Sequence, residues 1–154
     1  MQTSSKKAFT MIELVFVIVV IGILSAIAVP KLAATRDDAT ITKAIATVGS
    51  VRSAIATERQ KRILRGDFSA IGDLALAGGN STPIFDFFDG NNTLPVLEYP
   101  LRSCASGTDR GCWVRTNATT YTYNMPTGGT AVFTLSNNRF DCPSTDANCR
   151  LLTE

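Results

Sequence analysis

The stretch Lys6-Lys7-Ala8-Phe9-Thr10-Met11-Ile12-Glu13-Leu14 opens an apolar segment. The sixteen residues from Leu14 to Val29 carry no charge. About 20 apolar residues are enough to cross a bilayer as a helix. One carboxylate, that of Glu13, stands at the head of this apolar segment. A charged side chain inside hydrocarbon costs at least ~2.5 kcal/mol, so we expect Glu13 to have a partner.

A cut between Ala8 and Phe9 would supply such a partner. Glu13 is the fifth residue counted from Phe9, which places the two one helical turn apart. The cut would give Phe9 a new amine, which is a cation of the kind that Glu13 lacks. Two lysines and the small residue Ala8 stand directly before this point.

These residues resemble the N-terminal signal of type IV prepilins and type II secretion pseudopilins. In that family a short basic leader precedes a Phe-Thr-Leu-Ile-Glu-Leu-like core. The leader here is residues 1–8, and it ends in Ala8 where the family usually has glycine. The resemblance implies that a prepilin peptidase cuts between Ala8 and Phe9 and that the Phe9 amine is N-methylated. It also implies that Glu13 sets the assembly register by pairing with the Phe9 amine of a neighbouring subunit.

The apolar segment has two other interpretations, a secretory signal peptide and a simple membrane anchor. A secretory signal peptide has its small-residue cleavage site after the apolar stretch, whereas Ala8 lies before it. A simple membrane anchor needs only the length from Phe9 to Val29 and gives no reason for Glu13. The prepilin resemblance accounts both for the position of Ala8 before the apolar segment and for the presence of Glu13.

The net charge of +2 is unevenly distributed. Residues 1–66 hold ten Lys/Arg against four Asp/Glu, and residues 67–154 hold five against nine. Lys6 and Lys7 precede the span, which orients the N-terminus toward the cytoplasm by the positive-inside rule. We therefore expect a single-pass protein of the inner membrane whose C-terminal domain is periplasmic.

The four cysteines form two close pairs in sequence. Outside the cytoplasm an even number of cysteines is typical of disulfides, and three connectivities are possible. We expect the local pairs Cys104–Cys112 and Cys142–Cys149, because each encloses a turn-rich loop. A zinc site is the alternative, but there is no CxxC spacing and no histidine, so we expect no metal and no cofactor.

The regular elements predict an α+β fold. Apolar residues recur at spacings of three, four and seven after Pro30, which indicates an amphipathic helix over 31–66. This stripe comprises Ile41, Ala44, Ile45, Val48, Val51 and Ile55. Basic residues are concentrated in the last turns before Gly66. We expect them to end the helix by complementing its dipole. The alternative is that they form a nucleic-acid binding site. We expect a short helix over 67–77.

Three segments rich in β-branched and aromatic residues predict strands. They span 112–115, 119–123 and 130–135, with a hairpin turn at 126–129. The predicted fold is a long N-terminal helical spine packed against a small antiparallel sheet with disulfide-closed loops. Its parts are a leader (1–8), a transmembrane or filament-core helix (9–30), an amphipathic helix (31–66) and a globular domain (67–154).

The chain offers little chemistry for catalysis, so we predict that it is not an enzyme. It has no histidine and no glycine-rich phosphate loop. Asp141, Asp146 and Asn148 fit no EF-hand spacing, so a solvated loop is expected there rather than a calcium site. Asp89-Gly90-Asn91-Asn92-Thr93 matches the extended acceptor pattern of bacterial N-glycosylation.

The predicted function is structural. The mature chain is expected to polymerise through its N-terminal helix into a type IV pilus or a type II secretion pseudopilus. The partners that the resemblance implies are other subunits, the prepilin peptidase, the inner-membrane assembly platform and the lipid bilayer. The alternative is a minor pilin that acts as a binding module for DNA or a surface. The acidic C-terminal half argues against DNA.

Overall fold

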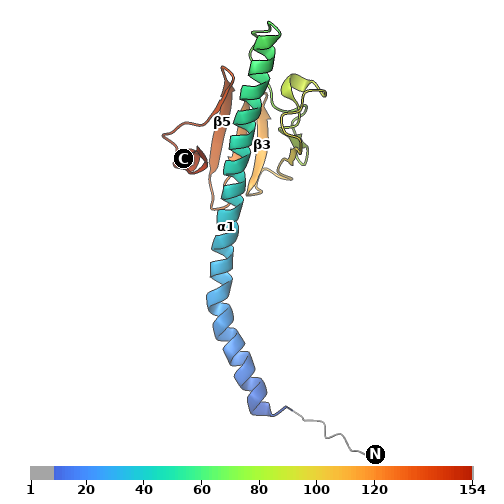
Figure 1. The fold of residues 1–154 in the computed structure, drawn as a ribbon. Helices are drawn as coiled ribbons and strands as arrows, with labels where there is room; N and C mark the ends of the chain where they lie inside the picture. Colours follow the sequence, from blue (N-terminus) through green and yellow to red (C-terminus); the bar gives the residue numbers. More distant parts are fainter. Residues whose placement is uncertain (1–8, 154) are drawn as a thin grey trace, which may run out of the picture. The chain divides into compact units, whose positions relative to one another are not determined.

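The computed structural model describes residues 9–153, except for the side chains at positions 30, 33 and 34. Its contacts divide the chain into two compact units that meet between Arg36 and Asp37. A continuous helix, α1, runs from Met11 to Leu64 (Figure 1). The other elements are β1 (Pro83–Ile84), the 3-10 turn η1 (Phe88–Gly90), β2 (Leu101–Arg102), β3 (Cys112–Asn117), β4 (Thr120–Asn124), β5 (Thr130–Ser136), β6 (Arg139–Asp141) and α2 (Ala147–Thr153).

The first unit contains the apolar part of α1. The segment Met11–Val29 has a mean hydropathy of 2.9 and is long enough to cross a membrane. None of this window is buried within the chain. An exposed apolar surface of this extent marks contact with lipid or with other protein chains.

In the second unit, α1 packs on the sheet through the predicted stripe. Ala44, Val48, Val51 and Ile55 are buried in one cluster with the aromatic residues of the strands. Their spacing of three and four residues places them on one face of the helix. Ile45 was assigned to the same stripe, and this was wrong: it is 41% exposed, because it lies one position further round the helix.

The helix ends as the sequence predicted, at a left-handed glycine. Gly66 has φ = +78°, a conformation that glycine adopts without steric cost. Its amide donates to the carbonyl of Ile63 at 3.0 Å, and the amide of Asp67 donates to that of Arg62 at 2.9 Å. This pair of bonds is a Schellman motif, which satisfies carbonyls that the last turn leaves free.

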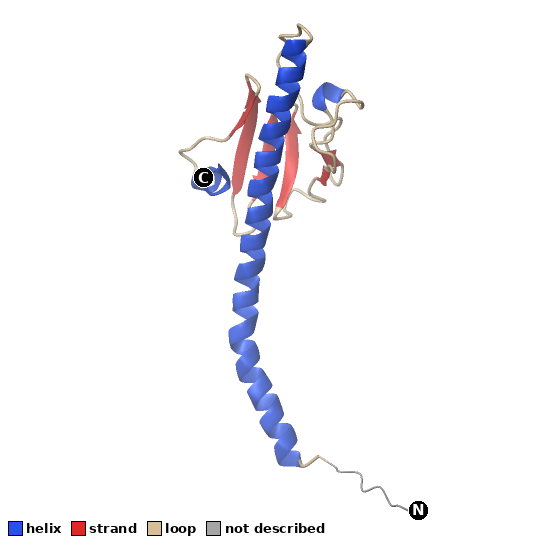
Figure 2. Ribbon diagram, in the orientation of Figure 1, coloured by secondary structure: helices blue, strands red, loops and turns tan. Residues whose placement is uncertain are grey.

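The main sheet is an antiparallel meander in the order β3-β4-β5-β6, and α1 crosses one of its faces (Figure 2). Side chains of β5 alternate between exposed and buried, as expected of a sheet with one solvated face. The three predicted strands are present. β3 and β5 extend slightly beyond the predicted ends, and β4 is shifted by one residue. The turn predicted at 126–129 joins β4 to β5.

Several elements were not predicted. β6 follows β5 through Asn137 and Asn138, whose φ angles are 50° and 60°. Two consecutive positive φ values define a type I′ hairpin turn, for which asparagine is well suited. The small β1-β2 ladder and α2 were also missed. The helix expected over 67–77 is absent, and an irregular segment takes its place.

Both disulfides are present in the local pairing. Cys104 bonds Cys112 across a Cα–Cα distance of 5.3 Å, and Cys142 bonds Cys149 across 5.6 Å. Each bridge closes a short loop and so restricts the unfolded chain. The second bridge ties the end of the sheet to α2.

Candidate functional site

The N-terminal end of α1 is built as a capping box. The backbone amide of Thr10 donates to Oε2 of Glu13 at 3.0 Å, and the amide of Glu13 donates to the Thr10 hydroxyl at 3.3 Å. The same hydroxyl donates to Oε2 of Glu13 at 2.9 Å. This reciprocal arrangement satisfies two amides that a helix start leaves unpaired. Thr10-Met11-Ile12-Glu13 has the spacing of this cap, a role that was not predicted for Thr10.

The cap gives Glu13 a partner within its own chain. All the hydrogen bonds that hold its carboxylate engage Oε2, so within residues 9–153 Oε1 is left without one. A carboxylate satisfied in this way costs less in an apolar environment than an unpaired one. The free oxygen is available to a group from outside the chain.

The predicted cleavage point lies at this end of the helix. Phe9 stands directly before the cap and is 83% exposed. Ala8, the residue before the predicted cut, lies outside the described residues. Phe9 and Glu13 share one end of α1, but no hydrogen bond or ion pair joins them in the described part of the chain.

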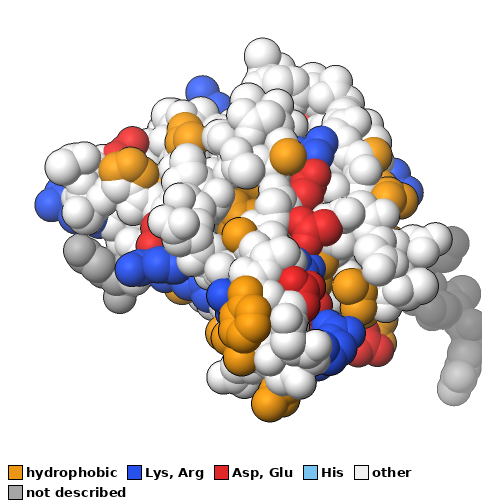
Figure 3. Space-filling view, turned by 90° about the horizontal axis from the view of Figure 1, so that it is seen from above, with side chains coloured by type: hydrophobic (Ala, Val, Ile, Leu, Met, Phe, Trp, Pro, Cys, Tyr) orange, Lys and Arg blue, Asp and Glu red, His pale blue; other side chains and the backbone are white. Residues whose placement is uncertain are grey.

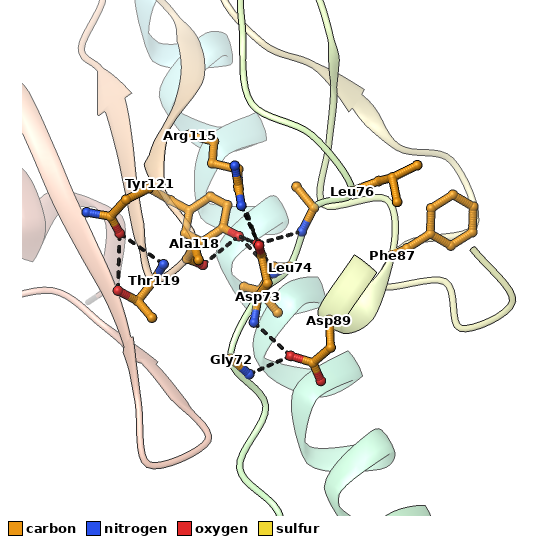
Figure 4. Close-up of polar contacts among 12 residues, drawn as sticks. Gly72, Asp73, Leu74, Leu76, Phe87, Asp89, Arg115, Ala118, Thr119 and Tyr121 are labelled. Carbon is orange, nitrogen blue, oxygen red and sulfur yellow. Dashed lines mark hydrogen bonds and ion pairs between the residues drawn. The ribbon is translucent and has the colours of Figure 1, made fainter. Parts of the chain in front are cut away.

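A second polar cluster fixes the irregular segment after α1 (Figure 4). Five consecutive backbone amides there donate to aspartate side chains instead of to helical carbonyls. Asp89 accepts from residues 72 and 73, Asp73 from residues 74 and 75, and Asp86 from residue 76. These bonds explain why the predicted helix is absent, since side-chain acceptors compete with the helical ladder.

Asp73 also links this segment to the sheet. It forms an ion pair with Arg115 on β3, and the hydroxyl of Tyr121 on β4 donates to its Oδ1 at 2.7 Å. Burial, together with the Asp73 carboxylate, raises the pKa of Tyr121, so the phenol stays neutral and donates. The hydrogen bond from Arg115 to Asp73 raises the pKa of that arginine.

Asp89 links the same segment to α1. Its Oδ2 lies 2.7 Å from Nη2 of Arg62, and Nε of Arg62 lies 3.1 Å from Oε1 of Glu58. Glu58 and Arg62 are only 3% and 6% exposed. Arg65 also pairs with Glu58, and Arg59 donates to the carbonyl of Ser69.

The basic cluster at the end of α1 therefore does more than complement the helix dipole, because part of it is committed to internal pairs. Figure 3, seen from above, shows Lys/Arg and Asp/Glu side chains next to one another on this face. A mixed surface of this kind differs from the continuous basic patch that nucleic-acid binding requires.

The carboxylates considered for other roles have partners in the protein. Asp141 pairs with Arg52 and Arg139, and Asp146 accepts the amides at the start of α2. The acidic residue of the glycosylation pattern, Asp89, is the one that binds Arg62. Each of these acids thus has a structural role.

The comparisons agree with the N-terminal site. Residues 3–29 match the prokaryotic N-terminal methylation motif. The chain is also 52% identical over 59 residues to the type IV narrow pilus major component PilA5 of Thermus thermophilus. That match covers 37% of this chain and 51% of the relative, so the chain spans about half the length of the curated relative it matches. No solved structure matches the chain.

The fold is α+β, and the N-terminal part of α1 is apolar and begins with a capping box. The match to the methylation motif and the similarity to a type IV pilin confirm the resemblance found in the sequence.

Proposed function

We propose that the chain is a membrane-anchored subunit that polymerises through its N-terminal helix into a type IV pilus. The observation that carries this proposal is Glu13, a capped carboxylate with one free oxygen at the head of an unburied apolar helix. The cap would serve any helix start, including that of a simple lipid anchor. The free oxygen would serve a helix that must find a fixed register among identical helices. A type II secretion pseudopilus would use the same device.

Assembly would move the helix from one apolar environment to another. In the bilayer the span Met11–Val29 contacts lipid, and in a filament the same side chains contact the helices of neighbouring copies. Burial of apolar surface alone does not favour the filament over the bilayer, because lipid tails are as apolar as the filament core. It also does not fix the position of one helix along its neighbour. A pair between Glu13 and the Phe9 amine of a neighbour would supply the axial register, as buried polar pairs do in other helical assemblies.

The other parts of the proposal follow from this mechanism. Residues 1–8 would form a leader on the cytoplasmic side, and the C-terminal domain would lie in the periplasm before assembly. A prepilin peptidase would remove the leader, and an inner-membrane platform would extract the helix.

Processing between Ala8 and Phe9 is the first test. Intact-mass analysis of the membrane-extracted protein should show the loss of residues 1–8 and the gain of one methyl group, because the Phe9 amine is the proposed partner of Glu13. The matched control is the same chain from cells without the peptidase, which should retain Met1. A chain that still begins at Met1 in peptidase-competent cells would contradict the proposal.

A further inference from the structure

A cavity of about 200 Å³ lies within the second unit, between α1 and the strands β2 and β3. Its walls include Thr47 from α1, the Cys104–Cys112 bridge at Cys112, and the ring of Tyr123 from β4. The Tyr123 hydroxyl donates to the carbonyl of residue 40 at 3.2 Å, which fixes the sheet to the helix at this point. The cavity is therefore bounded by elements that are held in place.

The charged residues that line this cavity are all basic. Lys43 and Arg102 line it, and none of the residues that line it is acidic. Arg102 donates to the carbonyl of Ser81 at 3.3 Å, and the Lys43 ammonium has no partner within residues 9–153. Elsewhere in this unit Arg52, Arg62 and Arg115 all pair with carboxylates.

A third donor in the wall is the indole of Trp113. The residue is only 3% exposed. Its indole N–H makes no hydrogen bond within residues 9–153. Yet no fully buried side-chain nitrogen or oxygen there lacks a partner. The indole nitrogen is therefore not fully enclosed, and Trp113 is one of the residues that line this cavity.

We propose that this cavity binds a small oxyanion, a carboxylate or a phosphate group, through Lys43, Arg102 and the Trp113 indole. Two cations and an N–H donor without a competing carboxylate provide charge-assisted hydrogen bonds to such a group. Trp113 and Tyr123, which also line the cavity, are buried, and a wall of low polarity strengthens hydrogen bonds to an anion. The argument for this site uses neither Glu13 nor the apolar span Met11–Val29 of α1.

The test uses the single tryptophan of the chain, because Trp113 lines this cavity and gives one indole N–H signal. The ¹⁵N-labelled full chain in nonionic detergent micelles is titrated with inorganic phosphate and, separately, with acetate. Sodium chloride at matched ionic strength is the reference. The indole resonance and the tryptophan fluorescence should change saturably with at least one oxyanion and not with chloride, and the comparison of the two arms identifies the anion class.

Variants locate the effect. Lys43→Gln and Arg102→Gln should each weaken the apparent affinity by about tenfold, the loss expected for one charge-assisted bond. Lys61→Gln, which removes an exposed lysine of the same helix outside this cavity, should leave it unchanged. The proposal is wrong if neither oxyanion moves the indole signal beyond the chloride reference. It is equally wrong if both Lys43→Gln and Arg102→Gln bind like the unaltered chain, or if Lys61→Gln weakens binding as much as they do.

Discussion

Replacing Glu13 by alanine is expected to leave the chain in the membrane but to remove most of its filaments. Insertion depends on apolar length, and deleting a carboxylate lowers the cost of insertion. In the filament, however, the Phe9 ammonium would be buried without a counter-charge. Deleting one partner of a buried ion pair costs about 3–5 kcal/mol, which strongly disfavours the addition of each subunit.

The measurement compares sheared surface filaments with the membrane pool in cells that express the assembly machinery. Thr10→Val is the matched control, because it removes the hydroxyl of the capping box and keeps the Glu13 carboxylate. Loss of an N-cap side chain costs about 1 kcal/mol, so this variant should still assemble. A normal filament yield from Glu13→Ala would remove the register role and favour the simple anchor.

Replacing Asp73 by alanine should lower the free energy of unfolding of the C-terminal domain by about 3 kcal/mol. The change leaves Arg115 without its ion-pair partner and removes the acceptor of the Tyr121 hydroxyl. It also leaves the amides of residues 74 and 75 without the Asp73 carboxylate. Asp73→Asn keeps an acceptor oxygen but loses the charge, so its effect should be intermediate.

Denaturant unfolding of the full chain in detergent, with both disulfides intact, measures this effect. Asp67→Ala is the control, since Asp67 is exposed and, within residues 9–153, its carboxylate accepts hydrogen bonds from the local residue Ser69 only. It should cost about 1 kcal/mol or less. Equal losses from Asp73→Ala and Asp67→Ala would show that the link between the irregular segment and the sheet contributes little.

The sequence predicted the parts of the fold that periodicity and local chemistry specify. The apolar span, the stripe on α1 and the left-handed Gly66 each depend on residues close together in the chain. The three longer strands were found because their β-branched and aromatic residues form runs. β6 has only three residues, but the Asn137-Asn138 pair before it carried a usable hairpin signal.

The segment after α1 could not be predicted in this way. Its conformation depends on Asp73 and Asp89, which bind Arg115 and Arg62 over separations of 42 and 27 residues. A prediction from residues 67–77 alone favours a helix, because Arg62 and Arg115 lie outside that segment. At the N-terminal site the resemblance supplied a role for Glu13, whereas the cap by Thr10 emerged only from the hydrogen bonds.

A high-resolution reconstruction of sheared surface filaments by cryo-electron microscopy would test the central proposal most directly. We expect a filament whose subunits begin at N-methylated Phe9 and whose core is a bundle of the helices up to Val29. The Glu13 carboxylate of each subunit should lie within hydrogen-bond distance of the Phe9 amine of a neighbour. Filaments that lack this chain, or that hold Glu13 away from every Phe9 amine, would contradict the account.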